Sequence, residues 1–205
     1  MATIYDLKPR FQLALRPLVA WLAGRGATAN QVTIAAALLS LLYGAVFAVT
    51  GGATLVLLGL PVVLFVRMAL NAIDGMLARE HGQASRLGFF LNEIGDVVSD
   101  VALYLPLALV AAPAHALLAG AMVIVFALTE FAGVLGLASG GDRRYDGPFG
   151  KSDRAAFFSA LAVLLALFVL PAWLPPAVLW LALGLGCVTI VNRVRRALEG
   201  SPSDV

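Results

Sequence analysis

The sequence is poor in charged residues and nearly lacks cysteine. Charged side chains make up 13% of its 205 residues and hydrophobic ones 61%, and the mean hydropathy is +0.93. Because soluble domains usually devote about a quarter of their residues to charge, this scarcity excludes a soluble domain and indicates an integral membrane protein. The single cysteine, Cys187, cannot form an internal disulfide. Charges and prolines interrupt the N-terminal segment before any apolar run begins, so we expect no signal peptide.

Long apolar runs fill most of the sequence and predict an all-α fold. A helix that crosses a bilayer needs about 20 mainly apolar residues. Six stretches meet this requirement: 31–50, 54–79, 87–111, 114–138, 154–171 and 175–192. Because short connections join them, we expect one domain over residues 1–205 with a six-helix bundle at 28–198. Residues 1–27 predict an amphipathic interfacial helix, which either anchors the chain or forms one wall of a lipid-entry site.

Basic residues alternate between the connections. Lys and Arg gather on the cytoplasmic side of short loops, and the links near Gly51, Pro113 and Trp173 contain none. They occur instead before the first run and after the second, fourth and sixth runs. The pattern predicts a multi-pass protein of a bacterial inner membrane with both termini in the cytoplasm. The net charge of +2 reflects this topology and does not indicate a nucleic-acid partner.

Residues 71–96 break the apolar background with acids, amides and glycines at helical spacing. Residues three or four apart share a helix face. The resulting faces carry Asn71, Asp74, Gly75 and Ala78 in the second run, and Gly88, Asn92, Asp96 and Asp100 in the third. The turn between them is short enough to make the helices antiparallel neighbours. Because polar groups are costly in a bilayer, we expect the two faces to converge on a functional site.

The acids of this segment predict a divalent cation. Carboxylates that lie close together repel one another unless a cation neutralises them, and the one cation well inside a predicted run is Arg67. Oxygen ligands from Asp and Asn, without His or Cys nearby, favour Mg²⁺ or Mn²⁺ over zinc.

Small residues at the same level indicate room for a nucleotide or diphosphate. Gly75, Ala78 and Gly88 remove side-chain bulk beside the acids and Arg79. Close packing between the helices is the structural alternative, but three small residues flanking an acid cluster favour a binding site.

A second candidate for phosphate binding precedes the first run. Thr28 is expected to cap a helix N-terminus. Asn30, with Thr33 one turn later, lies where exposed backbone N–H groups would favour a phosphate.

The polar residues resemble the motif D-x-x-D-G-x-x-A-R-x8-G-x3-D-x3-D of the CDP-alcohol phosphatidyltransferase family. Its spacing is matched at eight positions: Asn71, Asp74, Gly75, Ala78, Arg79, Gly88, Asn92 and Asp96. The likeness extends to Asn30 and Thr33, which resemble the family's P-N-x-x-T element with Ala29 in place of Pro. Within the family the chain is most similar to the bacterial branch called YnbA-like, which carries the same two asparagines.

The resemblance implies transfer of a phosphatidyl group from CDP-diacylglycerol to an alcohol or phosphorylated alcohol, with release of CMP. It implies one or two Mg²⁺ or Mn²⁺ ions held by Asn71, Asp74, Asn92 and Asp96, with Asp96 also acting as the base. It assigns the CDP portion to Asn30, Thr33, Gly75, Ala78, Arg79 and Gly88. Lys151 and Arg154 would bind an acceptor phosphate, or else serve topology and anionic headgroups. By resemblance we also expect a homodimer.

Asparagine stands at the first and third acidic positions of the motif, at Asn71 and Asn92. An amide oxygen can ligate Mg²⁺, but the loss of two charges should weaken a two-metal site. Three outcomes stay open: one metal, compensation by Glu93 or Asp100, or loss of transfer. Glu93 points about 100° away from Asn92 on a helix. Asp100 is the better additional site residue, with a buried pair to Arg67 as its alternative role.

Arg67 and Glu130 are the other charges within the predicted runs, and we expect them to neutralise each other, unless Glu130 faces the site and contacts the acceptor. Two further classes of function stay possible. Asn71 and Asn92 would suit a catalytically weak protein that binds a CDP-linked lipid. An ion-coupled transporter could also use intramembrane acids, although the motif spacing has no role in transport.

Overall fold

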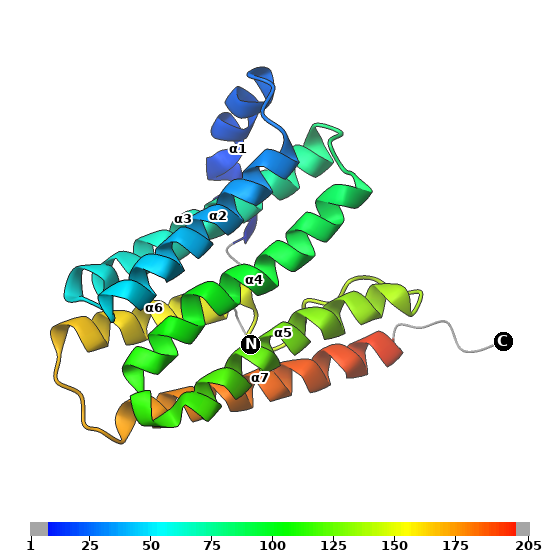
Figure 1. Cartoon of the computed structure of the whole chain (residues 1–205). Helices are drawn as coiled ribbons and strands as arrows, with labels where there is room; N and C mark the ends of the chain where they lie inside the picture. Colours follow the sequence, from blue (N-terminus) through cyan, green and yellow to red (C-terminus); the bar gives the residue numbers. More distant parts are fainter. Residues whose placement is uncertain (1–7, 200–205) are drawn as a thin grey trace.

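The computed structural model describes residues 8–199 and contains only helices there (Figure 1). In chain order they are α1 (Lys8–Gly24), α2 (Ala29–Thr50), α3 (Thr54–Glu80), α4 (Arg86–Ala111), η2 (Pro113–His115), α5 (Ala116–Ala138), α6 (Lys151–Leu167) and α7 (Leu174–Glu199). The predicted all-α membrane fold is therefore confirmed. The first residues of the predicted interfacial helix lie outside the described range.

Five segments of the described chain are long and apolar enough to cross a membrane, namely α2, α3, α4, η2 with α5, and α7. The predicted run at 154–171 is instead the 17-residue α6, which begins one turn earlier and ends at Leu167. Pro171 favours this early end, because it has no N–H to donate to the carbonyl of Leu167 four residues earlier and its ring would clash with that carbonyl; Phe168 is already extended. At 1.5 Å per residue α6 is about 26 Å long, slightly less than the hydrocarbon thickness of about 30 Å.

The helices pack as a bundle in which α2 lies against both α3 and α4, α3 against α6, and α5 against α7 (Figure 1). Helix α1 packs on α3 at one end, where Phe11 contacts Phe65 edge to face with ring centroids 5.8 Å apart. Where α2 passes α4, a Cβ on Gly44 would overlap the backbone of Ala102. Glycine thus sets the closest approach of these two helices.

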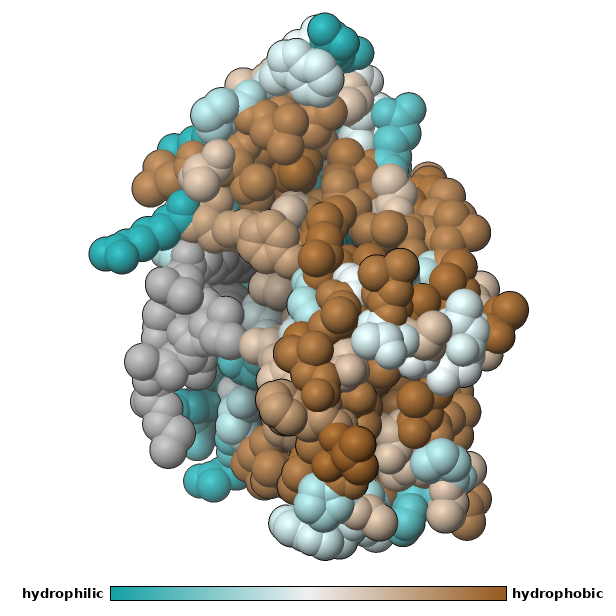
Figure 2. Space-filling model, turned by 90° about the vertical axis from the view of Figure 1, so that its left-hand side faces the viewer, coloured by the Kyte–Doolittle hydropathy of each residue, from teal (hydrophilic) through white to brown (hydrophobic). Residues whose placement is uncertain are grey.

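An aromatic core holds α4, α5 and α6 together. Tyr104, Phe126 and Phe158 are fully buried, with ring centroids of Tyr104 and Phe158 4.6 Å apart. Many large apolar side chains elsewhere are exposed, and Figure 2 shows hydrophobic residues over most of the middle of one face. Such a surface is suited to lipid.

The connections that lack Lys and Arg lie at one end of the bundle, after α2, α4 and α6, at the lower left in Figure 1. The α3–α4 and α5–α6 links reach the opposite end, as does the end of α7. The structure thus separates the two kinds of connection as the sequence predicts. Which end faces the cytoplasm stays a prediction.

Candidate active site

The motif faces of α3 and α4 meet near the basic end of the bundle. The structure brings Asn71 of α3 to Asp96 of α4, where the Asn71 side-chain amide donates to Asp96 Oδ1 at 2.9 Å. Both aspartates of the motif are buried, Asp74 and Asp96 each with 5% of the side chain exposed. Asn92 lies one turn before Asp96 and is half-buried. The predicted convergence of the two polar faces is confirmed. The prediction that these helices are direct packing neighbours is wrong, because α3 and α4 each pack mainly against α2 and meet through their long polar side chains.

Asp74 is held by a hydroxyl. The Thr33 side chain, on α2, donates to Asp74 Oδ2 at 2.7 Å. Within residues 8–199 no Lys or Arg forms an ion pair with Asp74. A buried carboxylate without a cation is costly, so Asp74 is poised to accept one. Thr33, predicted at the CDP phosphates, here orients this carboxylate.

Asp96 has two cations of its own. Arg67 donates to Asp96 Oδ1 at 3.1 Å, and the ammonium group of Lys151 bonds to Asp96 Oδ2. Lys151 lies in the first turn of α6 and its side chain is 25% exposed. Both oxygens of Asp96 are therefore bound by positive groups of the chain.

The predicted pair between Arg67 and Glu130 is wrong. Arg67 donates to Asp96 and also forms an ion pair with Asp100, whose Oδ1 lies 2.9 Å from Arg67 Nη1. Asp100 in turn lies 3.2 Å from the guanidinium group of Arg154. The alternative role given to Asp100, a buried partner of Arg67, is the one that the structure shows. Arg67 is on α3 and pairs with two acids of α4, whereas Glu130 is on α5 and pairs with other cations.

Glu130 instead forms ion pairs with basic residues of the α5–α6 link, α6 and α7. It is 2% exposed and its carboxylate forms ion pairs with Arg143 at 3.1 Å and Arg154 at 2.6 Å, with longer contacts to Lys151 and Arg193. Arg143 also forms a two-pronged bond with Glu93 at 2.6 and 2.7 Å. This pairing engages both oxygens of the Glu93 carboxylate, and compensation by Glu93 for a motif acid stays a prediction. The sequence did not reveal the roles of Arg143 and Arg193, because they lie in basic segments that topology alone explains.

The two candidates for acceptor binding differ in access. Lys151 reaches the surface in part, whereas Arg154 is fully buried and donates to Thr129 and Glu130. Acceptor binding by either stays a prediction. Arg154 as the structure has it serves the buried ion-pair network.

The nucleotide-binding candidates lie around the α3–α4 turn. A Cβ added to Gly88 would lie 2.7 Å from Asn30 Oδ1, so the glycine permits the approach of α4 to the start of α2. A Cβ added to Gly75 would lie 3.1 Å from the guanidinium group of Arg79, and Arg79 is an exposed residue. Ala78 is half-buried on the same helix. The structure gathers these residues at one end of the bundle, and their part in binding CDP stays a prediction.

Gln83 is a site-region residue that sequence reasoning missed. Its side chain accepts a hydrogen bond from the backbone N–H of Ala29 at 2.7 Å and donates to the carbonyl of Ala27 at 3.2 Å. It therefore ties the α3–α4 turn to the N-terminus of α2. Thr28 caps that helix as predicted, with Gln31 completing the capping box. The sequence signal for this contact was Ala29, which stands where the family element has proline. Alanine has a backbone N–H that needs a hydrogen-bond partner, whereas proline has none.

The donor set fits one Mg²⁺ or Mn²⁺ ion. Asp74 supplies a buried oxygen ligand without a cationic partner, and the amides of Asn71 and Asn92 are further hard ligands. Within residues 8–199 there is no cluster of three or more Asp, Glu, His or Cys side chains suited to a metal. Asn71 and Asn92 are amides and therefore do not count toward such a cluster.

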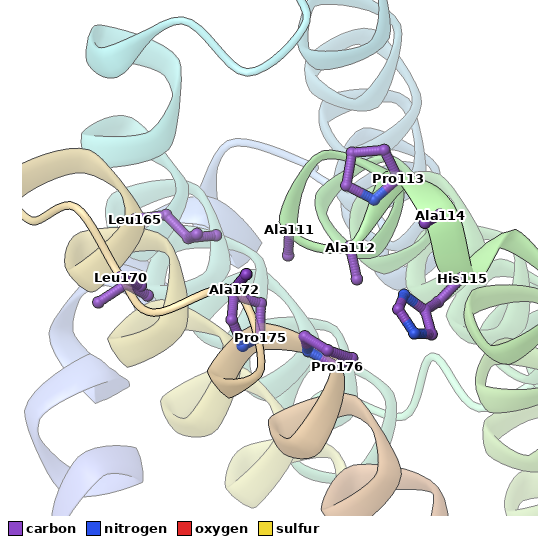
Figure 3. A pocket seen from close by; sticks show the side chains of 10 residues that line it. All are labelled: Ala111, Ala112, Pro113, Ala114, His115, Leu165, Leu170, Ala172, Pro175 and Pro176. Atoms are coloured by element: carbon purple, nitrogen blue, oxygen red, sulfur yellow. The ribbon is translucent and has the colours of Figure 1, made fainter.

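A pocket of about 440 Å³ lies at the other end of the bundle, between η2 and the α6–α7 link (Figure 3). Its lining is almost wholly apolar, with His115 the one titratable side chain. None of the motif residues borders it. The pocket is therefore separate from the candidate active site.

Comparison with known proteins identifies the family. The family model of CDP-alcohol phosphatidyltransferase matches residues 26–188. The chain is 48% identical over 198 residues to "Inner membrane protein YnbA" of Escherichia coli (strain K12), with 96% of each chain covered. It is 34% identical over 103 residues to "Archaetidylinositol phosphate synthase" of Pyrococcus horikoshii, about half of each chain. This protein belongs to the CDP-alcohol phosphatidyltransferase family.

The fold recurs in a solved structure. The crystal structure of Mycobacterium tuberculosis phosphatidylinositol phosphate synthase (PgsA1) with CDP-DAG bound superimposes with a TM-score of 0.72 at 22% identity, over 90% of this chain and 93% of the other. At that identity the match supports the shared membrane fold.

Proposed function

We propose that this protein transfers a phosphatidyl group from CDP-diacylglycerol to the hydroxyl of an alcohol or phosphorylated alcohol, releasing CMP. The observation that carries the proposal is that the buried motif acids Asp74 and Asp96 lie on polar faces of α3 and α4 that meet at one end of a membrane bundle. The family membership and the CDP-DAG-bound fold relative support the same donor.

The reaction is a displacement at phosphorus. The acceptor oxygen forms a bond to the β-phosphorus of the donor, and the bond from that phosphorus to the bridging oxygen breaks, so CMP leaves with the electron pair. The proton of the acceptor hydroxyl passes to a carboxylate oxygen, for which Asp96 is the proposed base. A bound Mg²⁺ or Mn²⁺ ion supplies charge stabilisation for the diphosphate. Asp74, Asn71 and Asn92 would hold it.

The protein's own side chains bind and orient the donor. Asn30, at the start of α2, faces Gly88 across a gap that admits no side chain. Arg79 is exposed beside Gly75, where its guanidinium can pair with a phosphate. The backbone exposed at these glycines lets the cytidine diphosphate lie close to both helices.

The decisive experiment is CMP release by the purified protein from CDP-diacylglycerol, with Mg²⁺ or Mn²⁺ and a pool of alcohols and phosphorylated alcohols. We expect release to require the metal, the acceptor and Asp96, and to fall at least about a thousandfold in Asp96→Asn. Asp142→Asn is the matched control, because Asp142 is exposed in the α5–α6 link and outside the motif. Full activity of the Asp96 variant would refute the assignment.

A second candidate function is binding of a CDP-linked lipid without transfer. The asparagines at positions 71 and 92 favour it. The family motif has aspartate at both positions, so the asparagines remove two negative charges that would help to bind metal ions for transfer. Titration with CDP-diacylglycerol separates the two: saturable binding without CMP release from any acceptor in the pool would support binding alone. Restoring both aspartates would then create activity that the parent lacks.

The proposed setting is the bacterial inner membrane, with the basic end and both termini in the cytoplasm, and a homodimer as the assembly. The alternating basic links support the orientation. Labelling of a single cysteine placed at Ser139, in a Cys187→Ala background, from outside intact cells tests the orientation, and crosslinking in membranes tests the dimer.

A further inference from the structure

We propose that this protein binds a single divalent ion, held at Asp74, and that Lys151 and Arg67 supply at Asp96 the positive charge that a second ion would otherwise provide. The inference rests on the proposed function only in taking this cluster as the reaction site. Its evidence is the distribution of cations among the buried acids.

The acids of the site divide into two kinds. Asp96, Asp100, Glu93 and Glu130 each form at least one ion pair with a Lys or Arg of the described chain. Asp74 is the exception among the five: the Thr33 hydroxyl and the backbone of Gly75 hydrogen-bond to it, and no Lys or Arg within residues 8–199 forms an ion pair with it. A divalent ion therefore finds one buried carboxylate that still needs a cation, which places it at Asp74.

Asp96, by contrast, has no carboxylate oxygen that lacks a cationic partner. Arg67 and Asn71 donate to its Oδ1, and Lys151 occupies its Oδ2. Arg67 is 3% exposed and fixed between Asp96 and Asp100, so its charge cannot be withdrawn to solvent. A dication at Asp96 would have to displace Lys151 and lie next to this fixed guanidinium, a repulsion that a buried position strengthens.

The total charge leads to the same number of ions. The cluster contains five acids and five cations and is therefore neutral: Asp74, Glu93, Asp96, Asp100 and Glu130 with Arg67, Arg143, Lys151, Arg154 and Arg193. One dication adds two positive charges, which a diphosphate carrying about two negative charges offsets. A second dication would leave two uncompensated charges in a mostly buried site, which is costly.

Asn71 and Asn92 complete this arrangement. With aspartate at both positions the cluster would carry two extra negative charges and call for a second dication. With asparagine it is neutral without one. The two asparagines and the two cations at Asp96 thus act in the same direction, because both lower the negative charge that a second metal ion would neutralise.

The test is a count of bound Mn²⁺ by electron paramagnetic resonance of the free ion, with the full-length protein in detergent. We expect one ion per chain in the parent and none in Asp74→Asn. Two ions, or none, in the parent would overturn the inference.

Lys151→Met should raise the affinity for Mn²⁺ about tenfold or more, because it removes a positive charge from beside the ion. Lys151→Arg should keep the parent affinity, and so should Arg196→Met, which removes an exposed cation at the same end of the bundle. An unchanged affinity in Lys151→Met would contradict the role of Lys151.

CMP release measured on the same samples separates this inference from the proposed function. Transfer with two bound ions would refute the single-ion site and leave the function standing. One bound ion without transfer from any donor would support the single-ion site and refute the proposed function.

Discussion

Replacing Glu130 by glutamine should destabilise the protein more than any loss of a surface charge. The carboxylate is 2% exposed and pairs with Arg143 and Arg154, with Lys151 and Arg193 close by. Glutamine keeps the shape but removes the charge, and so leaves the fully buried guanidinium of Arg154 with Asp100 as its remaining acid. Breaking one partner of a buried ion pair costs about 3–5 kcal/mol.

For a chain of about 200 residues each kcal/mol moves the unfolding midpoint by roughly 2–4 °C. Glu130→Gln should therefore lower the unfolding midpoint by roughly 6–20 °C in detergent. Tryptophan fluorescence or differential scanning calorimetry would measure the shift. Glu199→Gln is the matched control, because Glu199 pairs with Arg196 at 3.3 Å on the surface, where such a pair contributes at most about 1 kcal/mol.

A shift of less than about 3 °C for Glu130→Gln, or shifts of equal size in both variants, would refute the reasoning. The double variant Glu130→Gln with Arg154→Met provides a further check. It removes the stranded cation as well and should recover part of the loss. No recovery would mean that the cost lies in packing and not in charge.

Three further predictions concern the donor end, the metal and the helix packing. Gln83→Ala should raise the KM for CDP-diacylglycerol about tenfold, because it releases the α3–α4 turn from α2. The effect of Gln83→Ala should be smaller in an Ala29→Pro background, because proline suits the first turn of a helix and has no N–H for Gln83 to bind. An equal rise in KM with Ala29 and with Pro at position 29 would contradict this reasoning. Chelation with EDTA should abolish CMP release, and Mn²⁺ or Mg²⁺ should restore it; activity that survives chelation would exclude the metal. Gly44→Ala should destabilise the protein by about 1–3 kcal/mol, since its Cβ meets the backbone of Ala102, whereas Gly184→Ala, with open space around it, should be neutral or stabilising in the same thermal assay.

Hydropathy and helical spacing predicted the architecture because each depends on neighbours in sequence. The five long spans and the convergence of Asn71 with Asp96 required only the bilayer thickness and the 3.6-residue period. The end of α6 was misplaced by four residues, because apolar composition continues past Leu167 while the backbone, approaching Pro171, does not stay helical.

Partners of buried charges could not be predicted in the same way. Arg67 was assigned to Glu130 because these were the charges deepest in the predicted spans, yet the partner of each depends on which helices are neighbours. Glu130 meets Arg154 because α5 and α6 converge at the basic end, and Arg143 reaches it from a loop whose path the sequence does not define. Gln83 was missed for a similar reason, since a glutamine in a short turn is ordinarily solvated and gains its role only from the backbone of α2.

The charges of the site suggest where its specificity lies. At the proposed donor side the contacts are a hydroxyl, an amide and glycine backbone, and Asp74 there forms no ion pair with a Lys or Arg of the described residues. At the proposed acceptor side, by contrast, the partly exposed Lys151 and the mostly buried Arg143 are each already held by acids. An acceptor that carries a phosphate could compete with Asp96 and Glu130 for these cations, and its arrival would free Asp96 Oδ2 for the proton of the acceptor hydroxyl. A neutral alcohol would leave Lys151 on Asp96. We therefore expect phosphorylated alcohols to be the better acceptors, and Lys151→Met to reduce that preference by raising their KM. Equal kcat/KM for phosphorylated and neutral acceptors in the parent would contradict this coupling between acceptor charge and the base.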